Sequence, residues 1–177
     1  MSSDILLREA GQADALCLHA LATQVFLDTY ANQGIREAIA REAQHELSVA
    51  AFLEQLEAPA VRVLLAEHGG FLVAFASVTL GAAHSLVARR PAAELSRLYV
   101  QLPFMRRGIG ALLLRRVEAL ARAAGASTLW LTAWVGNARA LAFYASQGYE
   151  ELGSTYHEFE NERFENRLFA RALDAET

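Results

Sequence analysis

The sequence lacks the features that mark several classes of protein. Cys17 is the only cysteine, which excludes an intrachain disulfide framework and a metal site built on clustered cysteines. No apolar run reaches the roughly 18 residues of a membrane-spanning helix, and the first residues lack a basic stretch followed by an apolar one. Basic residues are not in excess, since 16 basic against 20 acidic residues give a net charge of −4. This balance disfavours nucleic acid as a partner, because phosphate backbones select basic surfaces.

The chain does contain enough apolar material for a folded core. Its 177 residues are 54% hydrophobic and 20% charged, which is typical of a folded domain and not of a disordered chain. We find no internal repeat and no low-complexity segment. These features predict a single domain over residues 1–177, in a cytoplasmic protein without a membrane or nucleic-acid partner.

The apolar pattern alternates between strand-like and helix-like periods along the chain. We expect strands at 5–8, 61–67, 71–80, 94–100 and 128–135, a closing hairpin from 149 to about 173, and helices at 16–30, 35–56 (whole or broken), 109–125 and 137–147. This order predicts an α/β (α+β) fold with a mixed, mostly antiparallel central sheet and helices on both faces.

The most informative segment is a glycine-containing turn that joins a predicted strand to a predicted helix. Gly108 and Gly110 stand where the helix begins, directly after Arg106 and Arg107. A helix start leaves backbone N–H groups unpaired and carries partial positive charge, and glycines let the main chain approach a ligand closely. The segment therefore predicts a cradle for a phosphate or diphosphate group.

Known phosphate-binding motifs do not explain this turn. A P-loop ends in Gly-Lys followed by Ser or Thr, and the sequence contains no such tripeptide. A dinucleotide fingerprint requires a third small residue at the position of Leu113. An ordinary strand-to-helix turn also accounts for two glycines, so the turn alone leaves both interpretations open.

A second segment favours a ligand. The residues from Asn137 to Tyr144 read Asn-x-x-Ala-x-x-Phe-Tyr, and Gly148 and Tyr149 follow shortly after. Together with Arg-Arg-Gly-Ile-Gly-Ala at 106–111, this pattern resembles the GNAT superfamily of acetyl-CoA-dependent N-acetyltransferases. The resemblance covers about residues 61–171, and the first 60 more loosely. It implies the acyl-CoA acyltransferase fold, acetyl-CoA (coenzyme A) as cosubstrate and no metal, and it allows a homodimer.

The resemblance also implies which residues bind the coenzyme. It assigns this role to Leu98, Tyr99, Val100, Met105, Arg106, Arg107, Gly108, Ile109, Gly110, Ala111, Asn137 and Tyr144. The strand at 98–100 would offer main-chain groups to pantetheine, and the turn would hold the diphosphate. Met105 departs from the Gln or Arg that the family usually has there. Asn137 equally suits the N-cap of the helix that follows it.

Two residues are expected to be catalytic. The resemblance places Tyr144 opposite the coenzyme sulfur, where it would donate a hydrogen bond to the departing thiolate. Glu94 matches the position of a glutamate base in the histone-acetylating branch, and even spacing puts it on the same strand face as Leu98 and Val100. A solvent-exposed glutamate, or one paired with Arg97, is the other interpretation. Alternative bases are Glu37, Tyr30 and His84.

The acceptor is the least determined part of the interpretation. Phe26 and Tyr30 lie in a segment similar to the acceptor side of bacterial polyamine acetyltransferases, and we expect them to bind substrate together with His84. The closing hairpin carries acidic residues that either attract spermidine or form a solvated face, namely Glu158, Glu160, Glu162 and Glu165. We therefore expect acetyl transfer to a polyamine or other small primary amine. The alternatives are acetylation of a peptide or protein N-terminus, and an acyl-CoA-binding module without turnover.

Overall fold

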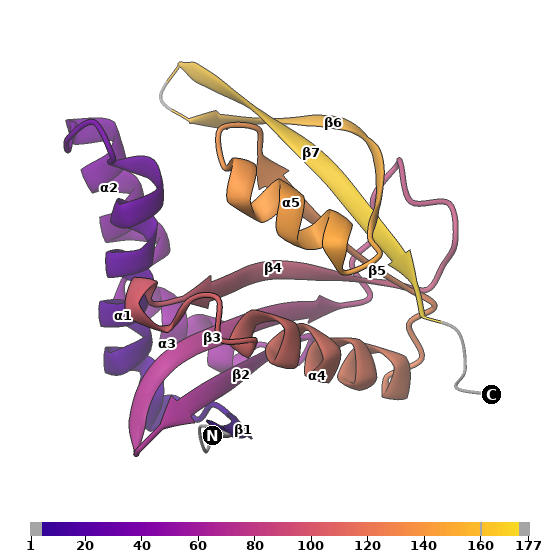
Figure 1. The fold of residues 1–177 in the computed structure, drawn as a ribbon, viewed down its shortest axis with the longest axis horizontal. Coiled ribbons are helices and arrows are strands. Elements are labelled where there is room, and N and C mark those ends of the chain that lie inside the picture. The colour runs from indigo at the N-terminus through magenta and orange to yellow at the C-terminus, as the bar shows by residue number, and fades with distance from the viewer. Residues whose placement is uncertain (1–4, 160, 174–177) are drawn as a thin grey trace. The chain divides into compact units, whose positions relative to one another are not determined.

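The computed structural model describes residues 5–159 and 161–173 (Figure 1). The strands are β1 Ile5–Glu9, β2 Val61–His68, β3 Phe71–Leu80, β4 Ala92–Val100, β5 Thr128–Trp134, β6 Glu150–Phe159 and β7 Glu162–Ala172. The helices are α1 Ala15–Tyr30, α2 Glu37–Glu46, α3 Val49–Glu57, α4 Ile109–Ala123 and α5 Ala138–Ser146, with short 3-10 helices η1 Gln12–Asp14 and η2 Leu102–Phe104. None of the helices in these ranges is long and apolar enough to cross a membrane.

The strands form one mixed sheet in the order β1-β2-β3-β4-β5-β7-β6. β4 pairs parallel with β5, and Ala92 lies opposite Thr128 at the start of that pairing. β5 pairs antiparallel with β7, β7 with β6, and β1 with β2. The prediction of a mixed, mostly antiparallel sheet is therefore confirmed.

The predicted helix over 35–56 is two helices, because Ser48 starts a new one. Its Oγ accepts a hydrogen bond from the Ala51 N–H at 3.1 Å, which satisfies one of the free amides at the start of α3. The other predicted elements are present with ends shifted by a few residues; β4, for example, begins at Ala92 instead of Glu94. Within the expected closing hairpin, Glu160 lies outside the described residues.

The described residues group into two compact units, each with a buried apolar cluster. Unit 1 comprises residues up to 77 together with 97–116, and unit 2 comprises 78–96 together with 117 onward. The unit 1 cluster joins α1, α2 and α3 to β2 and β3 and includes Leu18, Phe26, Phe52, Leu65 and Phe75. The unit 2 cluster includes Val87, Ala92, Trp130, Leu168 and Ala170.

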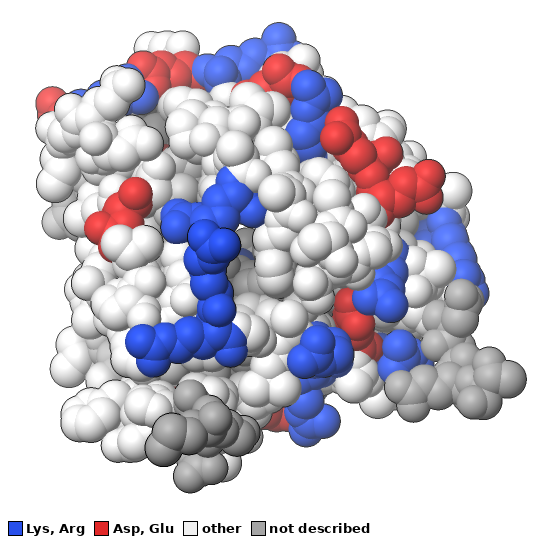
Figure 2. Space-filling model, in the orientation of Figure 1, with Lys and Arg blue, Asp and Glu red and all other residues white. Residues whose placement is uncertain are grey.

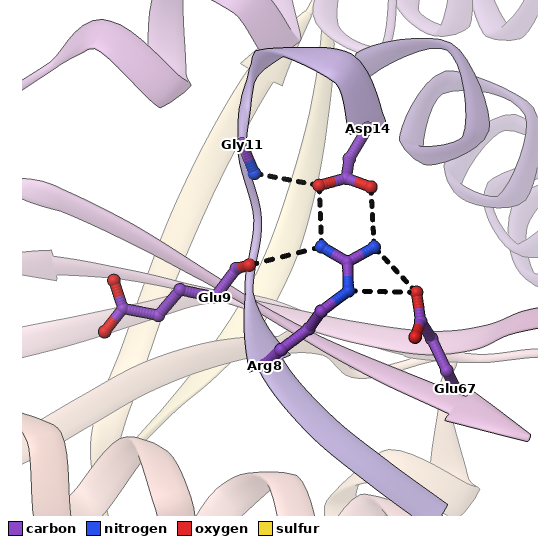
Figure 3. Close-up of polar contacts among 5 residues, drawn as sticks. All are labelled: Arg8, Glu9, Gly11, Asp14 and Glu67. Carbon is purple, nitrogen blue, oxygen red and sulfur yellow. Dashed lines mark hydrogen bonds and ion pairs between the residues drawn. The ribbon is translucent and has the colours of Figure 1, made fainter. Parts of the chain in front are cut away.

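An arginine on the first strand ties the start of unit 1 together (Figure 3). Arg8 donates from Nη1 and Nη2 to the two carboxylate oxygens of Asp14, both at 2.8 Å, and from Nε and Nη2 to Glu67 Oε1 at 3.0 and 2.6 Å. Asp14 also accepts from the Gly11 N–H at 2.8 Å. The charged Arg8 guanidinium lowers the pKa of Asp14 most, and the Gly11 N–H lowers it further. Through Asp14 and Glu67, Arg8 joins β1 to η1 and β2.

Replacing Arg8 by methionine should lower the free energy of unfolding by about 1–2 kcal/mol at pH 7, because two carboxylates lose a charged donor that is itself partly exposed. The pKa of Asp14 is lower in the folded state, so this stabilisation is complete above its ordinary value of 3.8 and is lost as the pH falls below it. Urea unfolding at pH 7 and pH 3 measures the difference.

The matched control for Arg8 is Arg62→Met, because Arg62 donates to the nearby carbonyls of Pro59 and Val61 and to no carboxylate among the hydrogen bonds seen in the described ranges. Its effect on unfolding should not change between the two pH values. A loss for Arg8→Met that is equally large at pH 3 would contradict the role assigned to the ion pairs.

Candidate active site

In unit 1, β4 leads through η2 and a short turn into α4. The Gly108 carbonyl accepts a hydrogen bond from the Leu112 N–H at 2.9 Å, so the helical bonding pattern starts at Gly108. Ile109 and Leu113 are 3% and 0% exposed, and this i, i+4 pair anchors the first helical turn. Arg106, Arg107 and Gly108 are exposed, so the turn faces outward while the helix behind it is fixed.

The backbone of this turn is bent in a way that suits an anion. Gly108 has φ +80° and Arg106 has φ +61°, both in the left-handed region. Glycine adopts this region freely, whereas a residue with a Cβ, such as Arg106, is held there at a cost of roughly 1–2 kcal/mol. Left-handed residues in a turn direct neighbouring N–H groups toward a common side, which forms a concave anion-binding surface.

The amides of the turn are not used by the protein itself. Within the described ranges, no protein group accepts a hydrogen bond from the N–H groups of Arg106 to Ala111. The Met105 N–H does donate, to the Leu102 carbonyl at 3.2 Å, so the available amides begin one residue later than the sequence suggests. The Arg107 guanidinium lies over the Phe104 ring at 5.2 Å, which keeps one positive charge beside the turn. These groups together can hold a diphosphate.

The end of β4 approaches the unit 1 core. Leu98, Tyr99 and Val100 are half-buried, and the Tyr99 ring meets Phe75 edge-on with centroids 5.4 Å apart. Burial raises the pKa of the Tyr99 hydroxyl. The side chain of Tyr99 therefore serves packing, and its backbone is what remains for a ligand.

Tyr30, which packs against Phe26, is influenced by a glutamate that sequence reasoning missed. The two rings are 4.8 Å apart on α1. Tyr30 is 36% exposed, and burial raises the pKa of its hydroxyl, as do the charges of Tyr99 and Glu42. Glu42 is half-buried on α2, three residues after Ile39 on the apolar helix face. This spacing could have shown from the sequence that Glu42 faces the protein and not the solvent. Aromatic rings beside a carboxylate suit a protonated amine.

Glu37, an alternative base, is poorly suited to that role. Its side chain is 76% exposed and pairs with Arg41 one turn further along α2. A solvated, paired carboxylate has no environment that would prepare it to take a proton from an amine. The structure therefore gives no support to Glu37 as the base.

In unit 2, α5 carries the two residues that the second motif singled out. Asn137 Oδ1 accepts from the Ala140 N–H at 3.1 Å, so its side-chain oxygen is the N-cap of α5. Its coenzyme role, which would use the side-chain NH2 group, stays a prediction. Tyr144 lies two turns further along and is 8% exposed. Its ring meets Phe143, Tyr149 and Phe169 with centroids 5.2, 5.9 and 6.2 Å apart.

The glycine before Asn137 has a packing reason that the motif alone does not reveal. A Cβ at Gly136 would lie 2.4 Å from ring atoms of Trp134. The indole of Trp134 therefore lies directly on the backbone of the β5–α5 connection, which only glycine permits without a shift of the ring. The Asn137 N–H donates to the Trp134 carbonyl at 2.9 Å, which completes this tight turn.

Glu94 and His84 also lie in unit 2. Glu94 is half-buried on β4 opposite Trp130, and burial raises its pKa. A carboxyl with a raised pKa is a better base near neutral pH. His84 instead organises its own loop: Nδ1 accepts from the Leu86 N–H at 3.2 Å and the ring lies 5.0 Å from Trp130. Its predicted substrate role stays a prediction.

Arginines accompany the acidic residues of the β6–β7 hairpin. Arg167 pairs with Glu165 at 3.4 Å and with Glu151 at 3.5 Å. The Arg163 guanidinium lies 3.7 Å over the Tyr156 ring on the neighbouring strand. Acidic and basic side chains are also interspersed on the face drawn in Figure 2. This mixture favours a solvated hairpin over an acidic surface that attracts a polyamine.

No group of three or more His, Cys, Asp or Glu residues in the described parts of the chain is placed to hold a metal ion. The groups described above are backbone N–H donors, carboxylates and tyrosines. These groups can move protons and stabilise developing charge.

Comparison with known proteins agrees with the motifs. The model of the acetyltransferase (GNAT) family matches residues 28–149. An uncharacterized N-acetyltransferase of Mycobacterium tuberculosis is 34% identical over 118 residues, which is 67% of this chain and 71% of the relative.

Two solved structures share the fold. The PaiA N-acetyltransferase of Thermoplasma acidophilum in complex with coenzyme A has a TM-score of 0.72 and 20% identity, over 93% of this chain and 98% of that one. A ribosomal-protein-alanine N-acetyltransferase of Brucella melitensis has a TM-score of 0.69 and 26% identity, over 94% of this chain and 99% of that one. At 20% identity, the first likeness concerns the fold alone.

Proposed function

This chain belongs to the acetyltransferase (GNAT) family, and from that premise we propose that it transfers an acetyl group from acetyl-CoA to a small primary amine. The observation that carries the proposal is the set of unused amides from Arg106 to Ala111 at the start of α4, within the described residues. The matched range 28–149 includes parts of both units, which supports the further proposal that residues 1–177 form one acetyltransferase domain.

In the proposed complex, the backbone of this chain makes most of the coenzyme contacts. The amides of the turn bind the diphosphate, with charge added by Arg106 and Arg107. The main chain of Leu98 to Val100 pairs with pantetheine, and N–H groups there stabilise the oxyanion that forms when the carbonyl is attacked. The Asn137 amide NH2 contacts the coenzyme, while its Oδ1 remains the helix cap.

The reaction we propose is direct attack by the neutral amine on the thioester carbon. An alkyl ammonium titrates near ~10.4, so only about one molecule in 10³ is neutral at pH 7. An ordinary carboxylate near ~4.3 is too weak a base to take that proton outright, and Glu94, whose pKa burial raises, is better matched. The amine proton passes to Glu94, directly or through water. The carbon–sulfur bond breaks, and the thiolate leaves with a hydrogen bond from Tyr144.

For the acceptor, we propose a polyamine or another small amine with a second cationic centre. The support is electrostatic: the half-buried Glu42 raises the pKa of the Tyr30 and Tyr99 hydroxyls in unit 1, and a carboxylate together with aromatic rings suits an ammonium group. The β6–β7 hairpin, in which Arg167 pairs with Glu165 and Glu151, gives less support. A peptide N-terminus is the second candidate, because a structural relative at 26% identity is named a ribosomal-protein-alanine N-acetyltransferase.

The test is release of free thiol from acetyl-CoA in the presence of separate acceptors. The panel contains spermidine, a monoamine of similar length, free alanine and a peptide that begins with alanine. The chain has no lysine, so its own side chains offer no primary amine and the background is low. We expect the highest kcat/KM with spermidine. A preference for the peptide supports the second candidate. If no acceptor causes thiol release although coenzyme A still binds, the protein is an acyl-CoA-binding module without turnover.

Replacing Glu94 by glutamine should remove the contribution of Glu94 to the acidic limb of the pH profile of kcat/KM, leaving only the rise set by deprotonation of the amine. In the wild type, the rate rises as the pH passes upward through the pKa of Glu94, which burial places above its ordinary value of 4.5. We expect the variant to be about 10²-fold slower near neutral pH. An acidic limb that is unchanged in Glu94→Gln would assign the base to another group, and Glu42→Gln is then the next variant to measure.

A further inference from the structure

A polar cluster of two buried residues and one exposed arginine lies where α5 ends in unit 2. The Tyr149 hydroxyl donates to Glu118 Oε1 at 2.8 Å, and Arg171 Nη1 donates to the same oxygen at 3.3 Å. Tyr149 and Glu118 are 4% and 7% exposed. The family resemblance and the proposed function assign no role to Glu118, Tyr149 or Arg171.

The cluster connects three elements that are distant in sequence. Glu118 belongs to α4, Arg171 to β7, and Tyr149 to the connection between α5 and β6. Arg171 Nη1 also donates to the Gln147 carbonyl at 3.0 Å, and Gln147 is the C-cap residue of α5. A cation that binds a free carbonyl at a helix end satisfies it and stabilises that end. The last turn of α5 is therefore fixed to both α4 and β7.

Tyr144 lies in that last turn and is held by the same residues. Its carbonyl accepts from the N–H groups of Gln147 and Tyr149, both at 3.1 Å. Its ring lies edge-on to the Tyr149 ring, with centroids 5.9 Å apart. A rotation of Tyr149 would therefore disturb both the main chain and the ring of Tyr144.

Apolar residues could fill this space without burying a charge. Glu118 is buried whereas the Arg171 side chain is 45% exposed, and burying a charged group is costly, so packing alone does not account for the carboxylate of Glu118. The carboxylate fixes the orientation of the Tyr149 side chain, because the Tyr149 O–H must point at Glu118 Oε1 for its hydrogen bond to be made. Burial and the neighbouring Glu118 raise the pKa of Tyr149, so its hydroxyl remains a donor under ordinary assay conditions.

We propose that Tyr149, Glu118 and Arg171 are positioning residues that hold the Tyr144 hydroxyl in the orientation required to hydrogen-bond the departing thiolate. The proposal rests on the proposed function, since it gives Tyr144 that role. Small errors in the placement of a catalytic group reduce the rate of the chemical step without weakening substrate binding.

The main test is a double-mutant cycle on kcat with Tyr149→Phe and Tyr144→Phe. Tyr149→Phe keeps the ring and removes the donor to Glu118. We expect kcat to fall about 10-fold while the KM for acetyl-CoA changes less than about twofold. In the Tyr144→Phe background, the same substitution should have almost no further effect on kcat, because the group it positions is gone.

The matched control is Tyr156→Phe, which removes a hydroxyl from a 51% exposed tyrosine on β6 and should leave kcat unchanged. If Tyr149→Phe has wild-type kcat, or if it lowers kcat by the same factor in the Tyr144→Phe background, the inference is overturned and the cluster is structural. If Tyr144→Phe itself has wild-type kcat, the assigned role of Tyr144 fails together with the inference.

A second pair of variants separates the contributions of hydrogen bond and charge. Glu118→Gln keeps an acceptor for the Tyr149 O–H but removes the charge that Arg171 faces, so we expect a smaller loss of kcat than for Tyr149→Phe. Arg171→Lys keeps the charge and should restore most of the activity that Arg171→Met loses. A larger loss for Glu118→Gln than for Tyr149→Phe in folded protein, or no recovery with lysine, counts against the proposal.

Crystal structures with bound coenzyme A provide a readout that does not depend on turnover. In Tyr149→Phe, we expect the Tyr144 hydroxyl to be displaced or to occupy more than one position relative to the sulfur. An unchanged Tyr144 position in that structure overturns the inference. This holds even if no tested amine is acetylated, so failure of the proposed function is distinguished from failure of the positioning role.

Discussion

Tyr144→Phe is expected to lower kcat about 100-fold while leaving the affinity for coenzyme A nearly unchanged, because general acid groups contribute about 10²–10⁴-fold. Phenylalanine keeps the ring contacts with Phe143, Tyr149 and Phe169, so the fold of unit 2 is preserved. What is lost is the hydroxyl. A tyrosine near ~10 and a thiol near ~8.5 make full proton transfer uphill by about 2 kcal/mol. In the proposed mechanism, Tyr144 therefore acts mainly by donating a hydrogen bond to the thiolate as it leaves.

The measurement is steady-state kinetics with the best amine of the panel, together with calorimetric titration of coenzyme A. A hydrogen bond that strengthens only as the thiolate forms lowers kcat without raising the coenzyme Kd when it is removed. Tyr156→Phe is again the control, since it removes an exposed hydroxyl from the same unit. If Tyr144→Phe weakens coenzyme binding as much as it lowers the rate, Tyr144 is a binding residue and not the acid.

Element ends were predictable where glycine or a cap marks them locally. β3 runs from Phe71 to Leu80 as expected, because Gly70 and Gly81 on either side adopt left-handed φ values that end the strand. The N-cap role of Asn137 could be read from the same kind of local rule. The division of the long helix at Ser48 also follows a capping preference, although the apolar pattern by itself continues through the break.

The candidate site was predictable only in part, because several of its features depend on tertiary contacts. The left-handed φ of Arg106 is not encoded by residue type, since arginine rarely adopts it. The role proposed for Glu42 depends on Tyr30 and Tyr99, which lie on other elements and whose pKa values Glu42 raises. Glu118 is separated from its partner Arg171 by 53 residues. Its position on the apolar face of α4, four residues after Leu114, was the one local hint.

The second large effect is expected at the glycine that opens α4, where Gly108→Glu should prevent coenzyme binding at ordinary assay concentrations. A Cβ at this position would meet no protein atom within 4 Å, so the protein itself leaves room for the side chain. The φ of +80° adds strain of roughly 1–2 kcal/mol for any residue with a Cβ. This strain lowers stability, but it does not by itself explain a loss of binding.

Electrostatic repulsion accounts for most of the expected loss of affinity. A carboxylate on residue 108 would lie among the amides that are proposed to hold the diphosphate, where it repels that group and competes for the same N–H donors. Two unit charges about 5 Å apart near a protein surface repel by about 3 kcal/mol, which corresponds to more than about 100-fold in Kd. Calorimetric titration of coenzyme A measures this directly.

Two neutral variants separate charge from shape and strain. Gly108→Ala tests the cost of the left-handed φ alone, and Gly108→Gln adds the same bulk as glutamate without its charge. We expect Kd to rise slightly for alanine, moderately for glutamine and most for glutamate. Only the glutamate variant should regain affinity at high salt, because screening weakens the repulsion between carboxylate and diphosphate. If glutamine is as harmful as glutamate, bulk decides the outcome. If glutamate binds coenzyme A like the wild type, the diphosphate does not bind at these amides.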